Sequence, residues 1–384
     1  MSMDWLSDEL ADIKSKGLYR ELRTIETAQT PRIKKDGREY ILLSSNNYLG
    51  LSTHPEVKRS AIEAIEKYGS GAGGSRLTTG NTDLYDNLEE KIADFKGTDD
   101  AIVFSSGYMA NIGTISALMT NGDMILSDEL NHASIIDGCR LSRADVKVYP
   151  HRDVAFIEKE LHASKNRKKL IVTDGIFSMD GDIAPLPEII EVAEKFDATV
   201  MVDDAHATGI LGKHCRGTGD YFNVKPDINM GTLSKALASS GGYIAGNSEL
   251  IDYLRNISRS FIFSTALSPP DVAAASTAID IIRKENPARK LWENIAIYKK
   301  GLIDAGFNIQ SETQIIPLIT GDTEMTHKVA LELEKLGIFV QGIRPPTVPE
   351  GKGRIRTTLM ATHSRQDISE ALNAIRKVKD KFNL

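Results

Sequence analysis

The sequence contains few cysteines. Its 384 residues include two, Cys139 and Cys215, and neither belongs to a Cys-x-x-Cys pair. Two isolated cysteines cannot form a disulfide framework, and they lack the spacing of a zinc site or a dithiol redox site. We therefore expect a protein of a reducing compartment, the cytoplasm.

Long apolar runs and an excess of either charge are also missing. No apolar run approaches the length of a membrane span, and the first twenty residues mix acids, bases and apolar residues, unlike a signal peptide. The 47 basic and 53 acidic residues give a formal net charge of -6, and the basic residues are scattered. This balance argues against a nucleic-acid footprint. We expect neither a membrane nor a nucleic acid as a partner.

The order of the apolar segments predicts an α/β fold. From about residue 40, short apolar runs alternate with stretches of helical periodicity, which is the pattern of βαβ units around a mostly parallel sheet. Near residue 285 this pattern changes to a mixed α+β pattern. We predict an N-terminal helical arm and segment over residues 1–40, a large domain over 41–285 and a small C-terminal domain over 286–384.

Polar residues that end the apolar runs are candidate site residues, because ligands of open α/β sheets bind beyond the carboxyl ends of the strands. In VMVDDAH, a run typical of a buried strand ends at Asp203 and Asp204, with His206 just beyond. In FSSGYMAN, Ser106 and Gly107 precede a helical stretch. The free N–H groups and the dipole of a helix start suit an anion such as phosphate, although plain capping explains the pair as well.

Lys235 follows another apolar run, in MGTLSKA, and small residues follow it. A lysine in such surroundings can act as an amine nucleophile toward a carbonyl, although a lone loop lysine is usually just solvated. A phosphate cradle, the strand-end Asp203 and the downstream Lys235 are together what pyridoxal 5'-phosphate requires. The lysine condenses with its aldehyde, and the carboxylate keeps its ring nitrogen protonated. The sequence therefore predicts this cofactor.

Other interpretations stay open at this point. Asp203, Asp204 and His206 could bind a metal ion in a hydrolase, although no spaced third cluster accompanies them, and we predict no metal site. His132 could be a buried histidine with one hydrogen bond, or could stack on a cofactor ring. The Gly-rich stretch 68–81 lacks the ending of a Walker loop, and we expect its glycines to let the backbone run close to a neighbour or ligand. A cofactor-binding regulator without activity is a rival of a different class.

Ten motifs, taken in order, resemble one family. They are SSNNYLGLS, GSGAGGSR, SSGYMAN, NHAS, DGIFSMDGD, VDDAHATG, GTLSKA, FSTALSPP, RPPTVP and RIRTTLMATH. This series is similar to that of the α-oxoamine synthases, pyridoxal-phosphate enzymes of the type I, aspartate aminotransferase-like fold. The resemblance runs from about residue 17 to the end of the sequence. It implies a large domain with a mostly parallel sheet and a smaller α+β C-terminal domain.

The resemblance also implies an activity, that of a pyridoxal-phosphate-dependent acyltransferase. Members of the family condense an amino acid with an acyl thioester, mostly with loss of carbon dioxide. The segments 177–189 and 344–349 are most similar to the branch that joins L-alanine to a pimeloyl thioester, on CoA or a carrier protein, in biotin synthesis. The branch that joins glycine to acetyl-CoA, or a dual-specificity enzyme, is the alternative.

The family's catalytic roles can be carried over residue by residue. Lys235 would bind the cofactor aldehyde and then act as acid and base at the substrate Cα. Asp203 would pair with the ring nitrogen, and His206 would bond the ring hydroxyl. His132 would stack on the ring face and help to position the substrate. Asp204 is expected to have a structural hydrogen-bonding role.

Binding roles follow in the same way. Arg356 would grip the amino-acid carboxylate, for which a bidentate guanidinium is suited. Further cofactor contacts would come from Gly107, Tyr108, Ser178, Thr232 and, across a homodimer with shared active sites, from Ser264 and Thr265 of the partner subunit. Further substrate contacts would come from Arg20, Asn46 and Thr347, although plain loop or surface contacts explain these three matches equally well.

Overall fold

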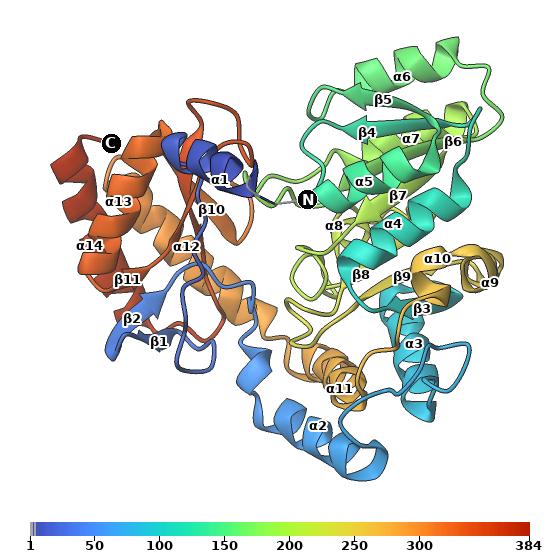
Figure 1. Ribbon diagram of the computed structural model, residues 1–384, viewed down its shortest axis with the longest axis horizontal. Helices are drawn as coiled ribbons and strands as arrows, with labels where there is room; N and C mark the ends of the chain where they lie inside the picture. The colour runs from blue at the N-terminus through green and yellow to red at the C-terminus, as the bar shows by residue number, and fades with distance from the viewer. Residues whose placement is uncertain (1–2, 4) are drawn as a thin grey trace. The chain divides into compact units, whose positions relative to one another are not determined.

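The computed structural model describes residue 3 and residues 5–384, so residues 1, 2 and 4 of the predicted arm lie outside the described residues. The chain divides into two compact units (Figure 1). Unit 1 comprises residues 1–45 and 291–384, and unit 2 comprises residues 46–290. The N-terminal segment therefore belongs to the same compact unit as the C-terminal part of the chain.

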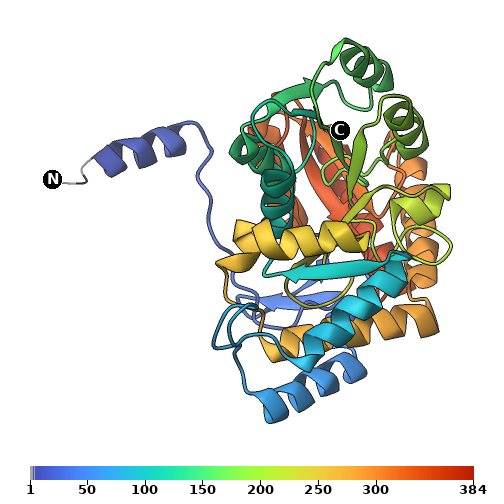
Figure 2. The same ribbon diagram turned by 90° about the vertical axis from the view of Figure 1, so that its right-hand side faces the viewer.

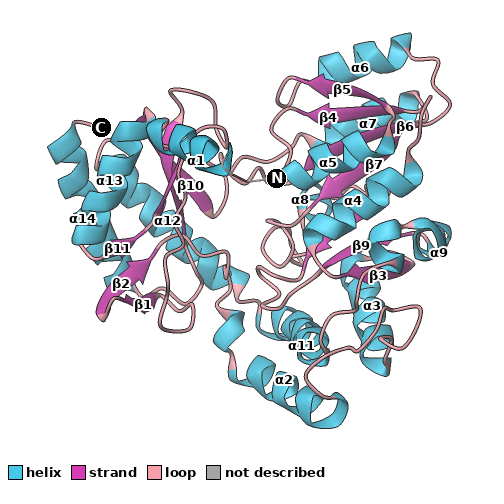
Figure 3. Ribbon diagram, viewed as in Figure 1, coloured by secondary structure: helices cyan, strands magenta, loops and turns pink. Residues whose placement is uncertain are grey.

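Unit 2 is built on a seven-stranded sheet, drawn in magenta in Figure 3. The strand order is β3-β9-β8-β7-β6-β4-β5, and of these seven strands only β9 runs opposite to the others. The prediction of a mostly parallel sheet is confirmed. The strands are β3 (Asp100–Phe104), β4 (Met124–Asp128), β5 (Asp145–Tyr149), β6 (Lys169–Asp174), β7 (Thr199–Asp203), β8 (Ile228–Thr232) and β9 (Gly242–Gly246).

Helices cover both faces of this sheet because its central strands are apolar on both faces. Along β6, Leu170 and Val172 belong to one apolar cluster, with residues of α4, α5, α9 and α10, whereas Ile171 belongs to another, with residues of α6 and α7. This alternation is the two-residue period of a strand. The helices of unit 2 are α2 (Pro55–Tyr68), α3 (Asp83–Lys96), α4 (Gly107–Leu118), α5 (Ala133–Ser142), α6 (Val154–Ala163), α7 (Leu186–Lys195), α8 (Thr218–Phe222), α9 (Ser248–Ile257), α10 (Arg259–Ile262) and α11 (Pro269–Glu285), with a short 3-10 helix at Leu51–Thr53.

The Gly-rich stretch packs against the segment that follows α10. Ser75 forms an isolated bridge with Thr265, and the N–H of Ala266 donates to the carbonyl of Gly74 at 3.0 Å. A Cβ at Gly80 would lie 2.8 Å from the Cβ of Ala266, closer than side chains approach. The expectation of a close backbone approach is confirmed at Gly80, whereas a Cβ at Gly69, Gly71 or Gly73 would meet nothing within 4 Å.

Unit 1 is an α+β layer. Its two three-stranded sheets have the orders β1-β2-β11 and β10-β13-β12. The strands are β1 (Arg32–Lys35), β2 (Arg38–Leu42), β10 (Ile315–Gly321), β11 (Ile338–Phe339), β12 (Gln341–Ile343) and β13 (Gly353–Thr358). The helices are α1 (Trp5–Ser15), α12 (Ala288–Asp304), which begins at the end of unit 2, α13 (Thr323–Lys335) and α14 (Arg365–Phe382).

The N-terminal helix is separate from the rest of unit 1. α1 buries none of its residues, and Figure 2 shows it standing away from the other elements of its unit. It ends at Ser15, and Gly17 follows with a φ of 64°, a left-handed conformation that glycine adopts readily. Among the described residues, no helix combines the length and the apolar character needed to cross a bilayer.

Candidate active site

A cavity of about 210 Å³ lies at the carboxyl ends of β6, β7 and β8 in unit 2. Its walls come from the loops that follow these strands and from the starts of α4 and α5. Seven of the residues predicted from sequence line it, namely Gly107, Tyr108, His132, Asp203, His206, Thr232 and Lys235. The structure therefore brings together side chains that are spread over 129 positions of the sequence, from 107 to 235.

The start of α4 forms one wall of the cavity. Ser106 caps the helix, since its side chain accepts a hydrogen bond from the N–H of Met109 at 3.1 Å. A Cβ at Gly107 would lie 3.1 Å from the Met230 methyl and 3.4 Å from the Thr232 hydroxyl oxygen. These contacts would be tighter than most Cβ contacts, so glycine favours the close approach of the first turn of α4 to β8. That turn offers N–H groups and the positive end of the dipole to an anion.

Asp203 ends β7 at the floor of the cavity, with 4% of its surface exposed. Its Oδ2 accepts from the side-chain amide of Asn111 at 2.7 Å, and its Oδ1 accepts from the N–H of Ala205 at 2.9 Å. Each carboxylate oxygen therefore accepts from one N–H group. Asn111 also lines the cavity, and the sequence analysis did not identify it, although it ends the SSGYMAN motif.

Asp204, the next residue, has different hydrogen-bond partners from Asp203. Its Oδ2 lies 2.8 Å from the ammonium of Lys96, and its Oδ1 accepts from the Thr218 hydroxyl at 2.6 Å. Burial alone would lower the pKa of Lys96, but the Asp204 carboxylate raises it above its ordinary value. The predicted structural role of Asp204 is confirmed.

The separate partners of Asp203 and Asp204 matter for the interpretation of this segment as a metal site. Because Asp204 is engaged by Lys96 and Thr218, it does not join Asp203 around a common centre. Within the described part of the chain, no group of three His, Cys, Asp or Glu side chains is arranged to hold a metal ion.

His206 is oriented by two residues that precede the 3-10 helix of unit 2. The Tyr48 hydroxyl lies 2.7 Å from Nδ1 of His206 and donates to the Asn46 side-chain oxygen at 2.9 Å. Since a phenol has one hydrogen, Nδ1 of His206 is then the donor to Tyr48. Asn46, a predicted substrate contact, is thus tied to the candidate cofactor residue His206 through Tyr48, which the sequence analysis did not identify.

Two titratable side chains near Lys235 have shifted pKa values. Burial raises the pKa of Asp174, which ends β6 and lines the cavity, well above its ordinary value; Asp203 adds to this rise and Lys235 opposes it. Burial lowers the pKa of His132, with Asp203 opposing and Lys235 adding to the effect. At neutral pH, His132 is therefore a neutral imidazole. Asp174 is a further cavity residue that the sequence analysis missed.

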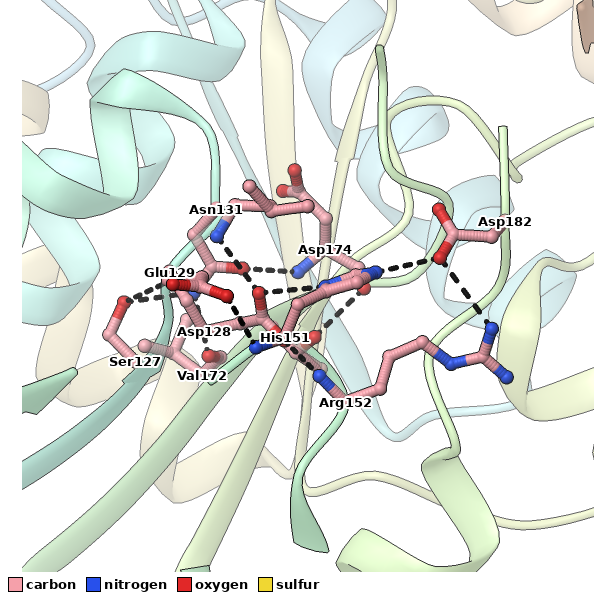
Figure 4. A network of polar contacts seen from close by, with 11 residues as sticks. Ser127, Asp128, Glu129, Asn131, His151, Arg152, Val172, Asp174 and Asp182 are labelled. Carbon is pink, nitrogen blue, oxygen red and sulfur yellow. Dashed lines mark hydrogen bonds and ion pairs between the residues drawn. The ribbon is translucent and has the colours of Figure 1, made fainter. Parts of the chain in front are cut away.

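A charged cluster around His151 joins Asp128, at the end of β4, to Asp182, in the loop after β6 (Figure 4). His151, which follows β5, lies 3.0 Å from Asp128 through Nδ1 and 2.7 Å from Asp182 through Nε2. Burial lowers the pKa of His151, but hydrogen bonds and charge from the two carboxylates outweigh it and raise the pKa to about 9. A protonated His151 therefore ties the loop after β4 to the loop after β6.

The remaining predicted residues lie outside this cavity. Ser178 lies half-buried in the loop after β6. Ser264 and Thr265 line a smaller pocket with Arg76 and Ser105. Arg20, Thr347 and Arg356 belong to unit 1, where Arg20 and Thr347 are exposed and Arg356 is buried on β13.

The chain belongs to the class I and II aminotransferase family, whose model matches residues 38–375. Among curated relatives, it is 49% identical to the 8-amino-7-oxononanoate synthase of Thermoanaerobacter pseudethanolicus, over 100% of this chain and 98% of that protein. It is 50% identical to the protein of the same name from Geotalea daltonii, over 100% and 99% of the two chains.

Solved structures agree with this assignment. A lysine-to-alanine variant of serine palmitoyltransferase from S. paucimobilis, determined with a bound PLP–myriocin aldimine, superposes with a TM-score of 0.93 at 33% identity over 99% of this chain and 98% of that chain. The 8-amino-7-oxononanoate synthase of Francisella tularensis superposes with a TM-score of 0.77 at 27% identity over 90% and 99% of the chains. The predicted type I fold is therefore confirmed.

Proposed function

We propose that this chain is a pyridoxal-phosphate-dependent acyltransferase that condenses L-alanine with a pimeloyl thioester. The products are 8-amino-7-oxononanoate, carbon dioxide and the free thiol of CoA or a carrier protein, and the reaction serves biotin synthesis. One observation carries the proposal. The cavity that joins Lys235, Asp203 and His132 lies in a chain 49% to 50% identical, over its whole length, to curated synthases of this name.

The side chains around the cavity fit pyridoxal phosphate. They offer an amine at Lys235, a carboxylate at Asp203 and a helix start at Gly107. When bound, the cofactor supplies an electron-withdrawing ring that stabilises negative charge at the Cα of an attached amino acid. Asp203 would hold the proton on the ring nitrogen, and the N–H groups of Asn111 and Ala205 fix the orientation of its carboxylate. The first turn of α4 and the Thr232 hydroxyl would hold the phosphate.

The same side chains account for the chemistry at the substrate. The Lys235 amine would take the proton from Cα and return it to the product. The neutral ring of His132 would donate a hydrogen bond to the acyl oxygen, where negative charge gathers during both condensation and decarboxylation. Arg356 would hold the amino-acid carboxylate until carbon dioxide leaves.

The proposal also covers assembly and location: the chain forms a homodimer with shared active sites in the cytoplasm. Ser264 and Thr265 are predicted phosphate contacts, yet they line a pocket apart from the cavity of their own chain. This separation supports their assignment to the partner's site. Mixing two inactive variants, Lys235→Ala and Thr265→Ala, should restore part of the activity if sites are shared, and should restore none if each chain is self-sufficient.

The substrate pair is tested by steady-state kinetics. Alanine and glycine, each with pimeloyl-CoA and acetyl-CoA, give four values of kcat/KM whose ratios measure differential binding of the transition state. Alanine with pimeloyl-CoA should be the preferred pair. Preference for glycine and acetyl-CoA would instead assign the alternative branch, and no turnover of any pair would favour a regulator.

The cofactor assignment has its own test. The wild-type protein should be yellow when saturated with pyridoxal phosphate, and Lys235→Ala should lose the absorbance of the lysine-bound cofactor. A wild-type protein that takes up no pyridoxal phosphate would refute the proposal.

A further inference from the structure

A continuous chain of hydrogen bonds links His132 to Asp203. The side-chain nitrogen of Asn111 lies 2.7 Å from Oδ2 of Asp203 and 2.9 Å from the hydroxyl oxygen of Ser134. That hydroxyl lies 2.7 Å from Nδ1 of His132. Asn111 and Ser134 are each 1% exposed, so water does not compete for these contacts.

The direction of each hydrogen bond follows from the chemistry of the groups. A carboxylate only accepts, so the side chain of Asn111 must present its NH₂ to Asp203, because its oxygen would be repelled there. The second N–H of the same NH₂ then donates to Ser134. Among the described residues, the oxygen of Asn111 has no partner, which leaves the NH₂ as the group that fixes this side chain.

Both polar groups of Ser134 face His132. The Ser134 oxygen accepts from Asn111, which leaves its single O–H free to donate to Nδ1 of His132 at 2.7 Å. The backbone N–H of Ser134 also points at Nδ1, at 3.3 Å, as expected where His132 caps α5. Because a backbone N–H can only donate, Nδ1 must accept, and the Ser134 hydroxyl is then a second donor to it. A neutral ring therefore carries its hydrogen on Nε2.

We propose that Asn111 and Ser134 are positioning residues that hold His132 in its Nε2–H tautomer, so that the ring presents a donor to the acyl oxygen of the substrate. The part of this inference that concerns the substrate rests on the proposed function, whereas the tautomer itself does not. Because burial lowers the pKa of His132, the ring is neutral in the working pH range, where the two tautomers differ in what they can donate.

The first test reads the tautomer directly, in protein freed of cofactor. Protein labelled with ¹⁵N in histidine gives side-chain ¹⁵N–¹H correlations that distinguish Nε2–H from Nδ1–H, and His132→Gln assigns the signal. We expect the Nε2–H pattern in the wild-type protein. An Nδ1–H pattern there would overturn the inference.

Variants of Ser134 test the cause. Ser134→Ala should add an Nδ1–H population and lower kcat roughly tenfold or more while the KM for the amino acid changes little, because the lost donor acts in the transition state. Ser134→Thr, which keeps a hydroxyl, should retain the wild-type pattern and most of kcat. Ser142→Ala is a matched control, because Ser142 lies on the same helix, is buried and donates to the carbonyl of Cys139 at 2.6 Å. A wild-type tautomer pattern in Ser134→Ala would refute the role of Ser134.

Asn111→Asp tests the direction of the chain. An aspartate at 111 would accept from the Ser134 hydroxyl and so remove that donor from Nδ1, leaving only the backbone N–H of Ser134 there. An Nδ1–H population should therefore appear, as in Ser134→Ala. An unchanged tautomer would refute the role of Asn111. If the tautomer behaves as expected while no substrate pair is turned over, the proposed function fails and the inference about His132 stands.

Discussion

Replacing His151 tests the charged cluster that it forms with Asp128 and Asp182. His151 lies between the carboxylates of Asp128 and Asp182, and the Arg152 guanidinium lies 3.5 Å from Asp182. The His151 backbone N–H also donates to Glu129. His151→Gln keeps a polar side chain of similar length but removes the positive charge. We expect the variant to be less stable than the wild-type protein, by an amount that depends on pH.

The magnitude follows from the pKa. A histidine whose pKa is about 9 in the folded protein and about 6.5 in the unfolded chain contributes at most about 3 kcal/mol, fully present below pH 6.5. This contribution is lost as pH rises through 9, and about 2 kcal/mol of it disappears between pH 7 and pH 9. The side chain is 22% exposed, so solvent screening reduces these values somewhat.

The assay is urea unfolding of both proteins at several pH values between 6 and 9.5. The stability difference between wild type and His151→Gln should shrink by about 1 to 2 kcal/mol from pH 7 to pH 9. His162→Gln, at an exposed position of α6, is the matched control and should show no such trend. A difference that stays constant over the whole range, or grows toward alkaline pH, would contradict a protonated His151.

Three further predictions concern the walls of the cavity and the buried charges. Gly107→Ala should weaken pyridoxal phosphate binding about tenfold or more in an absorbance titration, because a Cβ there pushes α4 from β8, whereas Gly71→Ala, with open space around it, should not. Asp204→Ala should lower the free energy of unfolding by about 3 to 5 kcal/mol, because Lys96 stays buried without its counter-charge. Adding Lys96→Met should restore part of this stability, and a double variant as unstable as Asp204→Ala would contradict the cause. Asp174→Asn mimics the protonated acid. Because the pKa of Asp174 is raised in the folded protein, the wild-type protein should lose stability relative to this variant as pH rises above about 4. Plots of unfolding free energy against pH that run parallel for the two proteins would contradict the raised pKa.

The residues that could be predicted from sequence are those that stand at the ends of strands. Asp203 follows an apolar run directly, and Gly107 and Lys235 follow others at short distance, so the rule that ligands bind beyond the strand ends was enough to group them. The parallel order of these strands brings their ends to one edge. This explains why seven of the predicted residues line one cavity.

The residues that were missed act through partners far away in sequence. Asn111 lies inside an apolar helix and contacts Asp203 across 92 positions, while Tyr48 contacts His206 across 158. His151 follows an unremarkable strand end, and its charge arises only where two other loops bring carboxylates to it. Such roles depend on which face of an element meets which loop, and local sequence patterns do not carry that information.

The pairing of the Gly-rich stretch with the segment at Thr265 has a consequence for how the protein behaves on dilution. In the proposed homodimer, the residues that complete the phosphate end of each site are held in place by the neighbouring chain's own glycine loop. Retention of the cofactor would then depend on total protein concentration, and monomers formed on dilution would release it. Cofactor binding and subunit association would then be linked equilibria, so that each favours the other.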